Sequence, residues 1–176
     1  PTVDEMRSAG TPFVGLLYAG LALTSRGLRV VEFNARFGDP ETQPIMLRLQ
    51  SSLVLLVEAA LAKALNKIEA QWDSRPSLGV VMAAGGYPGE YSKGAAIRGL
   101  DSAAQLEGKV FHAGTALADG AVTTAGGRVL CATALGETVS AAQQNAYALA
   151  ARIEWDGHFY RHDIGYRAIA REQGES

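Results

Sequence analysis

Cysteine is almost absent from this sequence, since Cys131 is the only one among 176 residues. A single cysteine cannot form a disulfide within the chain, which excludes a disulfide-stapled scaffold and favours a reducing, cytoplasmic compartment. Cys131 itself stands in an apolar run of β type. There a buried and unreactive thiol is the expectation.

An excess of charge of one sign is also missing. The 16 Lys and Arg residues nearly balance the 18 Asp and Glu residues, and neither sign is gathered in a block. Proteins that bind nucleic acids or anionic lipid carry basic patches or stripes. We therefore expect neither a nucleic-acid partner nor a membrane partner.

Long apolar runs are lacking as well. The longest, residues 53–65, is interrupted by Glu58 and Lys63. It falls short of the roughly 20 apolar residues that a membrane-spanning helix needs. Its apolar residues recur at helical spacing after Ser51 and Ser52, either of which can cap a helix. The pattern predicts a core helix.

The two ends of the sequence carry little information of their own. The start has neither an initiator methionine nor the features of a signal peptide, so we expect the chain to be part of a longer protein. The polar tail at residues 171–176 is expected to be loose.

Two modules can be distinguished, with a boundary near residue 75, and the expected fold class is α+β. In residues 1–75, two β-leaning runs, 15–23 and 27–37, flank a polar turn and predict a hairpin. Residues 76–176 are predicted to form a small antiparallel β-barrel-like domain with a flanking helix at about residues 138–152. Its short β runs are residues 78–84, 95–100, 109–114, 121–124 and 127–135.

The most informative segment is residues 31–43. Glu32, Asn34 and Arg36 alternate with apolar residues, so they share one face of a strand while the apolar face packs. Side chains two apart stand roughly 6.6 Å apart, which lets a carboxylate and an amide oxygen converge on Mg²⁺. Arg36 can clamp a phosphoryl or carboxylate oxygen. The alternative is an ordinary strand with one solvated face.

The residues after this strand predict the start of a short helix. Asp39 is suited to the N-cap, and Pro40 to the first helical position. Backbone N–H groups at a helix start favour anions. An N-cap and a first helical turn are one explanation of Asp39, Glu41 and Gln43.

Residues 31–48, VEFNARFGDPETQPIMLR, resemble the metal-binding strand of ATP-grasp ligases as it occurs in the phosphoribosylamine–glycine ligase family. Further segments, in matching order and spacing, extend the resemblance over nearly the whole chain. These are residues 16–20, 77–89, 110–115 and 126–136. The resemblance implies that residues 1–75 are the C-terminal portion of an ATP-grasp domain.

The resemblance also implies a reaction of de novo purine synthesis. ATP phosphorylates the carboxylate of glycine, and the amine of 5-phosphoribosylamine attacks the glycyl phosphate to give glycinamide ribonucleotide, ADP and phosphate. On the family pattern Glu32 and Asn34 are ligands of Mg²⁺ or Mn²⁺, and Arg36 steadies the reacting oxygens. The resemblance also makes Asp39, Glu41 and Gln43 candidates for lining the pocket of glycine or the ribose. ATP is the expected co-substrate, and small molecules are the expected partners. Many ATP-grasp enzymes have a second acidic ligand on the preceding strand, but residues 15–20 contain no carboxylate.

Two other functions stay open from the sequence, namely a different ATP-grasp ligase or carboxylase and a non-catalytic binding module. Residues 1–176 do not contain the phosphate-gripping half of the family enzyme, so we expect them to be inactive alone. Apolar strand and helix surface is expected to be uncovered and to allow self-association.

The remaining signals are weaker. His158 and His162 are four residues apart without an evident third metal ligand, so packing or surface histidines are expected. Residues 85–89, GGYPG, are expected to form a turn rather than a phosphate loop. His112 and Arg128 are candidates for lining a cleft, without a catalytic role.

Overall fold

A computed structural model describes residues 2–174, which divide into two compact units. The first unit comprises the residues up to Asp39 together with Leu49–Trp72, and the second comprises Pro40–Arg48 together with the chain from Asp73 onward. Helix α2 (Thr42–Arg48) therefore belongs to the second unit. A domain boundary near residue 75 stays a prediction.

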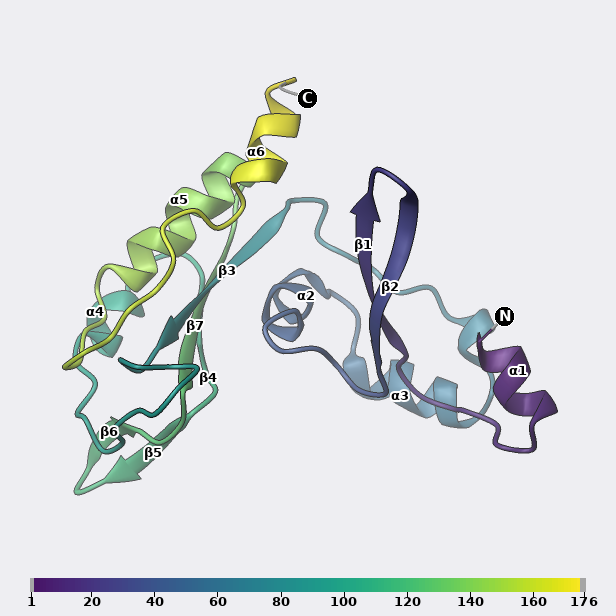
Figure 1. The fold of residues 1–176 in the computed structure, drawn as a ribbon, viewed down its shortest axis with the longest axis horizontal. Helices are drawn as coiled ribbons and strands as arrows, with labels where there is room; N and C mark the ends of the chain where they lie inside the picture. Colours follow the sequence, from purple (N-terminus) through teal and green to yellow (C-terminus); the bar gives the residue numbers. More distant parts are fainter. Residues whose placement is uncertain (1, 175–176) are drawn as a thin grey trace. The chain divides into compact units, whose positions relative to one another are not determined.

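The first unit contains the predicted hairpin. Strands β1 (Tyr18–Thr24) and β2 (Gly27–Asn34) pair antiparallel (Figure 1). The turn uses Gly27 at a φ of 88°, a backbone conformation that glycine adopts without steric cost. The prediction of a strand reaching Phe37 is wrong, because β2 ends at Asn34 and Arg36 lies in a bend.

The helices of the first unit are α1 (Thr2–Ser8) and α3 (Leu53–Leu61), followed by a 3-10 turn η1 (Leu65–Lys67). Ser52 caps α3, since its Oγ accepts from the backbone N–H of Leu55 at 3.5 Å. The helix stops short of the predicted end at Leu65, because Lys63 takes a left-handed φ of 55°. The expected core helix is wrong for the described residues, in which Ala59 is its only buried residue.

Much apolar surface of the first unit is exposed. Val31 is 70% exposed and Phe33 is 49% exposed, so the predicted packed face of β2 is open in this structure. The exposed large apolar residues of β1, β2 and α3 are Leu21, Leu23, Leu28, Val30, Val31, Phe33, Leu53, Val54, Leu55, Val57 and Leu61. Uncovered strand and helix surface is thus confirmed, and self-association stays a prediction.

The second unit is built on a three-stranded antiparallel sheet. Its strand order is β3 (Ser77–Ala83), β7 (Arg128–Leu135) and β4 (Lys109–His112). Strands β5 (Thr115–Ala118) and β6 (Ala121–Thr124) form a separate hairpin. The antiparallel α+β class is confirmed. The strands in residues 2–174 form no closed barrel, because β3 and β4 pair only with β7 and leave their outer edges without a common ladder.

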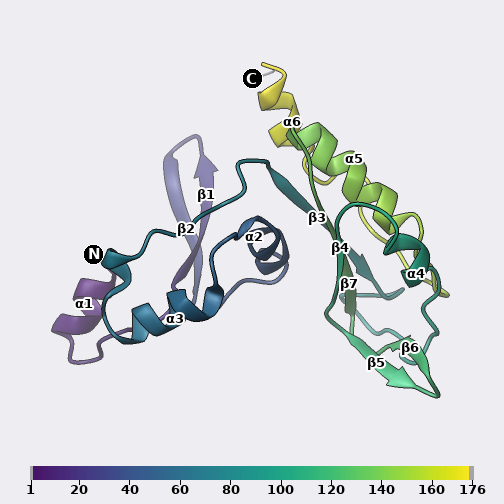
Figure 2. The ribbon, with the colours of Figure 1, turned by 180° about the vertical axis from the view of Figure 1, so that it is seen from behind.

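Helices cover both faces of this sheet. Helix α5 (Val139–Ala150) lies along one face (Figure 2), where Ala142, Ala146 and Leu149 join the core. Its N-terminus is capped by Thr138, whose Oγ1 accepts from the N–H of Ala141 at 3.0 Å. Helix α2 contacts β3 and β7. Because both faces are covered, the central strand β7 is an almost continuous apolar run.

Two predictions for the second unit are wrong. Residues 95–100 form isolated bridges rather than a strand and lead into α4 (Leu100–Ala103). The tail is helical as far as Glu172, in α6 (Tyr166–Glu172), and residues 175–176 lie outside the described range. Glu172 accepts from the N–H groups of Val139 and Ser140 at 3.0 and 3.4 Å, which fastens α6 to the start of α5. None of the helices in residues 2–174 has the length and apolarity to cross a membrane.

Candidate active site

The side chains of Glu32 and Asn34 lie together on one face of β2, as the period of two predicts. Asn34 Nδ2 donates a hydrogen bond to Glu32 Oε1 at 2.8 Å. In the antiparallel register Glu32 stands opposite Gly20, and Asn34 stands opposite Tyr18. The Asn34 carbonyl oxygen is not used in this bond. A half-turn of the amide places that oxygen beside the Glu32 carboxylate.

The spacing of this pair fits a divalent cation. Ligands about 2.1 Å from an octahedral Mg²⁺ stand about 3.0 Å apart when they are adjacent. Asn34 Nδ2 and Glu32 Oε1 are 2.8 Å apart in their hydrogen bond, which brings the ends of the two side chains close enough to reach one cation. No group of three or more His, Cys, Asp and Glu side chains that could hold a metal occurs in residues 2–174. One carboxylate and one amide are nevertheless a sufficient protein contribution for Mg²⁺, which keeps water and phosphate oxygens as its other ligands.

Arg36 and Asp39 follow the pair in an irregular segment. The Arg36 guanidinium donates from Nη1 to the carbonyl oxygen of Phe37 at 2.8 Å. The helix predicted at Pro40 is wrong in its start, because Asp39, Pro40 and Glu41 form a turn and α2 begins only at Thr42. Asp39 is exposed. The roles of Arg36 and Asp39 stay predictions.

Glu41 immediately precedes α2, Gln43 lies in the first turn of that helix, and both are half-buried. Pro44 falls in the first turn of this helix, where its missing N–H costs no intrahelical hydrogen bond. A Cβ at Gly79 on β3 would stand 3.3 Å from Pro44 Cγ and 2.9 Å from Cys131 Sγ. Gly79 therefore lets α2 lie close against the sheet. This contact fixes the start of α2, next to Glu41 and Gln43, on the second unit.

The end of α2 is held by hydrogen bonds from Arg48 to Asp73, and Asp73 in turn forms an ion pair with Arg75. The Arg48 guanidinium donates to the carbonyl oxygen of Asp73 from Nε at 3.1 Å and from Nη2 at 2.8 Å. The Asp73 carboxylate accepts from Arg75 Nε at 3.0 Å and Nη2 at 2.8 Å. The side-chain hydrogen bonds of Arg75, followed by its backbone N–H, lower the pKa of Asp73 to about 2.

The histidines make local contacts. His158 and His162 flank Tyr160, with ring centroids 6.4 and 4.9 Å away. His158 Nδ1 lies 2.8 Å from the carbonyl oxygen of Trp155. His112 Nδ1 lies 3.0 Å from Thr115 Oγ1, and this histidine borders a cavity of about 380 Å³ in the second unit. Residues 85–89 form a turn and bend after β3, as predicted.

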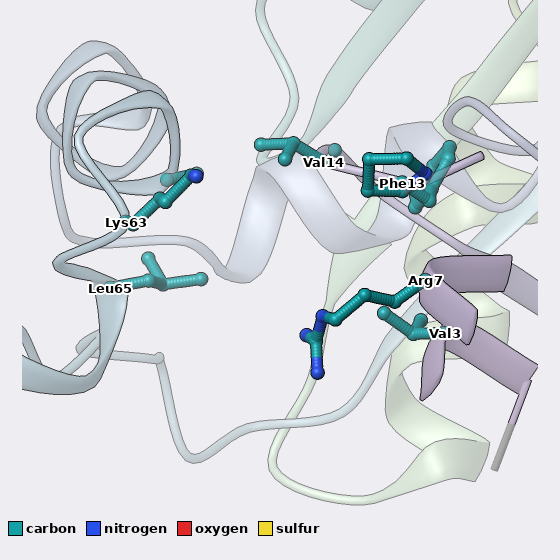
Figure 3. A pocket seen from close by; sticks show the side chains of 9 residues that line it. Val3, Arg7, Phe13, Val14, Lys63 and Leu65 are labelled. Carbon is teal, nitrogen blue, oxygen red and sulfur yellow. The ribbon is translucent and has the colours of Figure 1, made fainter. Parts of the chain in front are cut away.

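A cavity of about 370 Å³ lies within the first unit, between α1, the segment after it and the end of α3 (Figure 3). Arg7 and Lys63 bring positive charge to an apolar lining that includes Phe13 and Leu65. Arg7 is paired with Asp4 at 3.3 Å. None of the residues predicted for the site lines this cavity.

Gly20 is a neighbour of the proposed site that was not among the residues predicted for it. A Cβ on Gly20 would stand 3.2 Å from Glu32 Cγ, so the side chain of Glu32 occupies the space that a larger residue would fill. The available signal was a glycine inside a β-type run, which is typical of a bulge or of close approach by another group.

Comparisons with known proteins identify the family of this chain. A family model described as phosphoribosylglycinamide synthetase, C domain, matches residues 77–167, and one described as the ATP-grasp (A) domain of the same synthetase matches residues 1–42. The phosphoribosylamine–glycine ligase of Pseudomonas syringae pv. tomato is 70% identical over 99% of this chain. That of Vibrio parahaemolyticus is 59% identical over 98% of it.

A solved structure agrees with the sequence relatives. The crystal structure of phosphoribosylamine–glycine ligase from Thermotoga maritima matches 90% of this chain and 39% of its own, with a TM-score of 0.75 and 35% identity. The chain spans 41% of the length of the Pseudomonas and Vibrio relatives. The C-domain model alone covers more than half of this chain. The chain therefore belongs to the phosphoribosylglycinamide synthetase family.

Proposed function

We propose that this chain is part of an ATP-dependent ligase that joins glycine to 5-phosphoribosylamine. ATP phosphorylates the glycine carboxylate and leaves as ADP. The amine of 5-phosphoribosylamine then attacks the carbonyl carbon of glycyl phosphate and expels phosphate, which gives glycinamide ribonucleotide. The reaction belongs to de novo purine synthesis, and we place it in the cytoplasm. Glycine, 5-phosphoribosylamine and ATP are the proposed partners.

Glu32 and Asn34 are the proposed ligands of Mg²⁺ or Mn²⁺. When bound, the cation neutralises negative charge on the phosphates during phosphoryl transfer. Glu32 contributes a formal negative charge and Asn34 a neutral oxygen from the same strand face. The observation that carries the proposal is this pair, 2.8 Å apart, in a chain 70% identical to a protein named phosphoribosylamine–glycine ligase.

Arg36 is the proposed group that steadies the reacting carboxylate and phosphoryl oxygens. Its guanidinium uses Nη1 on a neighbouring carbonyl oxygen and has four further N–H donors. A planar guanidinium can hold two oxygens of a phosphoryl group at once. Asp39, Glu41 and Gln43 are the proposed contacts to glycine or the ribose. Asp39 and Glu41 belong to the turn that precedes α2, and Gln43 lies in the first turn of that helix.

The proposed activity is that of the full-length gene product. Phosphoryl transfer depends on positioning several charged groups at once, and residues 1–176 match only 41% of the relatives' length. We expect residues 1–176 alone to bind ATP weakly or not at all and to have no ligase activity. Turnover by this segment would contradict that part of the proposal.

The test is ADP release by the full-length gene product in the presence of glycine and 5-phosphoribosylamine, with each co-substrate omitted in turn. We expect release only when both are present, and glycinamide ribonucleotide as product. Release that requires another acid or amine would replace the proposal with a different ATP-grasp ligase. Nucleotide left unchanged with every acid and amine tested would favour a binding module.

A further inference from the structure

A β-bulge lies beside the proposed metal ligand. The register of the hairpin pairs Gly20 with Glu32 and Leu21 with Val30, so Val31 is an extra residue without a partner on β1. Bulges interrupt the alternation of a strand and re-aim neighbouring side chains, and they are frequent next to active sites. Here the interruption falls immediately before Glu32.

Gly20 leaves the space into which the Glu32 side chain extends. A Cβ at position 20 would approach Glu32 Cγ to 3.2 Å, while the Glu32 backbone O and N atoms would be 3.5 and 3.7 Å away. The backbone distances are ordinary contacts. Only the flexible side chain of Glu32 would have to move, and its carboxylate would move with it.

We propose that Gly20 is a positioning residue that holds the Glu32 carboxylate beside Asn34 for metal binding. This inference rests on the proposed metal role of Glu32. With Gly20 in place Glu32 Oε1 accepts a hydrogen bond from Asn34 Nδ2 at 2.8 Å, so the ends of the two side chains lie close enough to reach one cation. A side chain at position 20 displaces Glu32 Cγ by a few tenths of an ångström, and the carboxylate beyond it moves with it.

The backbone conformation of Gly20 is compatible with an alanine. The φ of Gly20 is outside the positive range that side chains avoid. Replacing such a glycine by alanine reduces the entropy of the unfolded chain and leaves stability unchanged or raised. Gly20→Ala is therefore expected to weaken metal binding without lowering stability. If Gly20 served only the folding of the hairpin, the same substitution would lower both metal binding and stability.

The experiment is Mn²⁺ binding, followed by electron paramagnetic resonance of free Mn²⁺, on the full-length gene product with a non-hydrolysable ATP analogue. We expect Gly20→Ala to weaken Mn²⁺ binding about 10-fold or more, the size seen when groups that orient metal ligands are altered. The Tm should equal or exceed that of the unsubstituted protein. Ala19→Ser, which adds one heavy atom on the other face of β1, should change neither quantity.

Glu32→Gln distinguishes the positioning role of Gly20 from the metal-binding role of Glu32. If it weakens Mn²⁺ binding and Gly20→Ala does not, the positioning role is overturned and the metal role stands. If Glu32→Gln leaves Mn²⁺ binding intact, the metal role fails and the positioning role fails with it. An unfolded Gly20→Ala protein would also overturn the inference, because it would mean that the added Cβ meets more than a flexible side chain.

Discussion

The contact between α2 and the sheet of the second unit can be tested at Gly79. In Gly79→Ala the new Cβ would lie 2.9 Å from Cys131 Sγ, 3.3 Å from Pro44 Cγ and 3.4 Å from Thr133 Oγ1. The first distance is shorter than a van der Waals contact. Cys131 is 1% exposed and Thr133 is fully buried, so neither side chain can turn into solvent. The strain must then be relieved by moving α2 or β7.

The expected loss follows from two opposing effects. Overpacking a buried site costs about 1–3 kcal/mol. Replacing glycine by alanine returns about 0.4–1 kcal/mol through the unfolded chain where the backbone allows it. We expect Gly79→Ala to lower the free energy of unfolding of the second unit by about 1–2 kcal/mol.

The assay is urea unfolding of variants made in a Trp72→Phe background, followed by the fluorescence of Trp155, which is 3% exposed in the core of that unit. Cys131→Ala removes the sulfur that makes the closest contact. The double variant Gly79→Ala, Cys131→Ala should therefore be less destabilised than the sum of the single variants, by about 0.5 kcal/mol or more. Strict additivity, or an unchanged midpoint in Gly79→Ala, would refute the proposed close approach.

Two further predictions concern the same unit. Leu130 is fully buried in β7, so Leu130→Ala should lower the free energy of unfolding by about 2–5 kcal/mol in the same assay. Leu117→Ala is the control, since Leu117 is 76% exposed and should change it by no more than about 0.5 kcal/mol. Leu130→Ala with a wild-type midpoint would contradict the observed core. The pKa of Asp73 is lowered from 3.8 to about 2, so its pairing with Arg75 stabilises the folded state fully above pH 3.8 and is lost as the pH falls through about 2. Asp73→Asn should therefore be less stable than wild type at neutral pH, and the difference should close between those two values; a difference already gone at pH 5 would exclude the ion pair as its source.

The hairpin and the central strand could be predicted because their signals are local. Gly27 follows a polar turn, and alternation on the second strand places Glu32 and Asn34 on one face. The apolar run of residues 127–135 likewise predicts a strand, and β7 is found there.

The features that escaped prediction depend on residues distant in sequence. Helix α6 is fastened by Glu172 to the start of α5, a contact that no local pattern contains. The assignment of α2 to the second unit depends on its contact with Gly79 of β3. Helix α3 and the 3-10 turn η1 separate β3 from α2 in the sequence. The bulge beside Glu32 depends on the register with Gly20 and could not be derived from β2 alone.

The exposure of apolar residues on β2 and α3 shows the limit of periodicity. The pattern identifies the apolar face correctly, but burial of that face requires a partner surface. Val31 and Phe33 are exposed, although they alternate with Glu32 and Asn34 as expected. Periodicity thus predicts which side chains share a face, and not whether this chain covers it.

The central claim is that Glu32 supplies a metal-binding carboxylate to an ATP-dependent ligase. Its most direct test is the rate of glycine-dependent and 5-phosphoribosylamine-dependent ADP release by the full-length gene product carrying Glu32→Ala. Glu58→Ala is the matched control, because Glu58 is an exposed glutamate on α3 outside the proposed site. The account predicts a loss of about 100-fold or more for Glu32→Ala and wild-type rates for Glu58→Ala. Equal rates in all three proteins would contradict it.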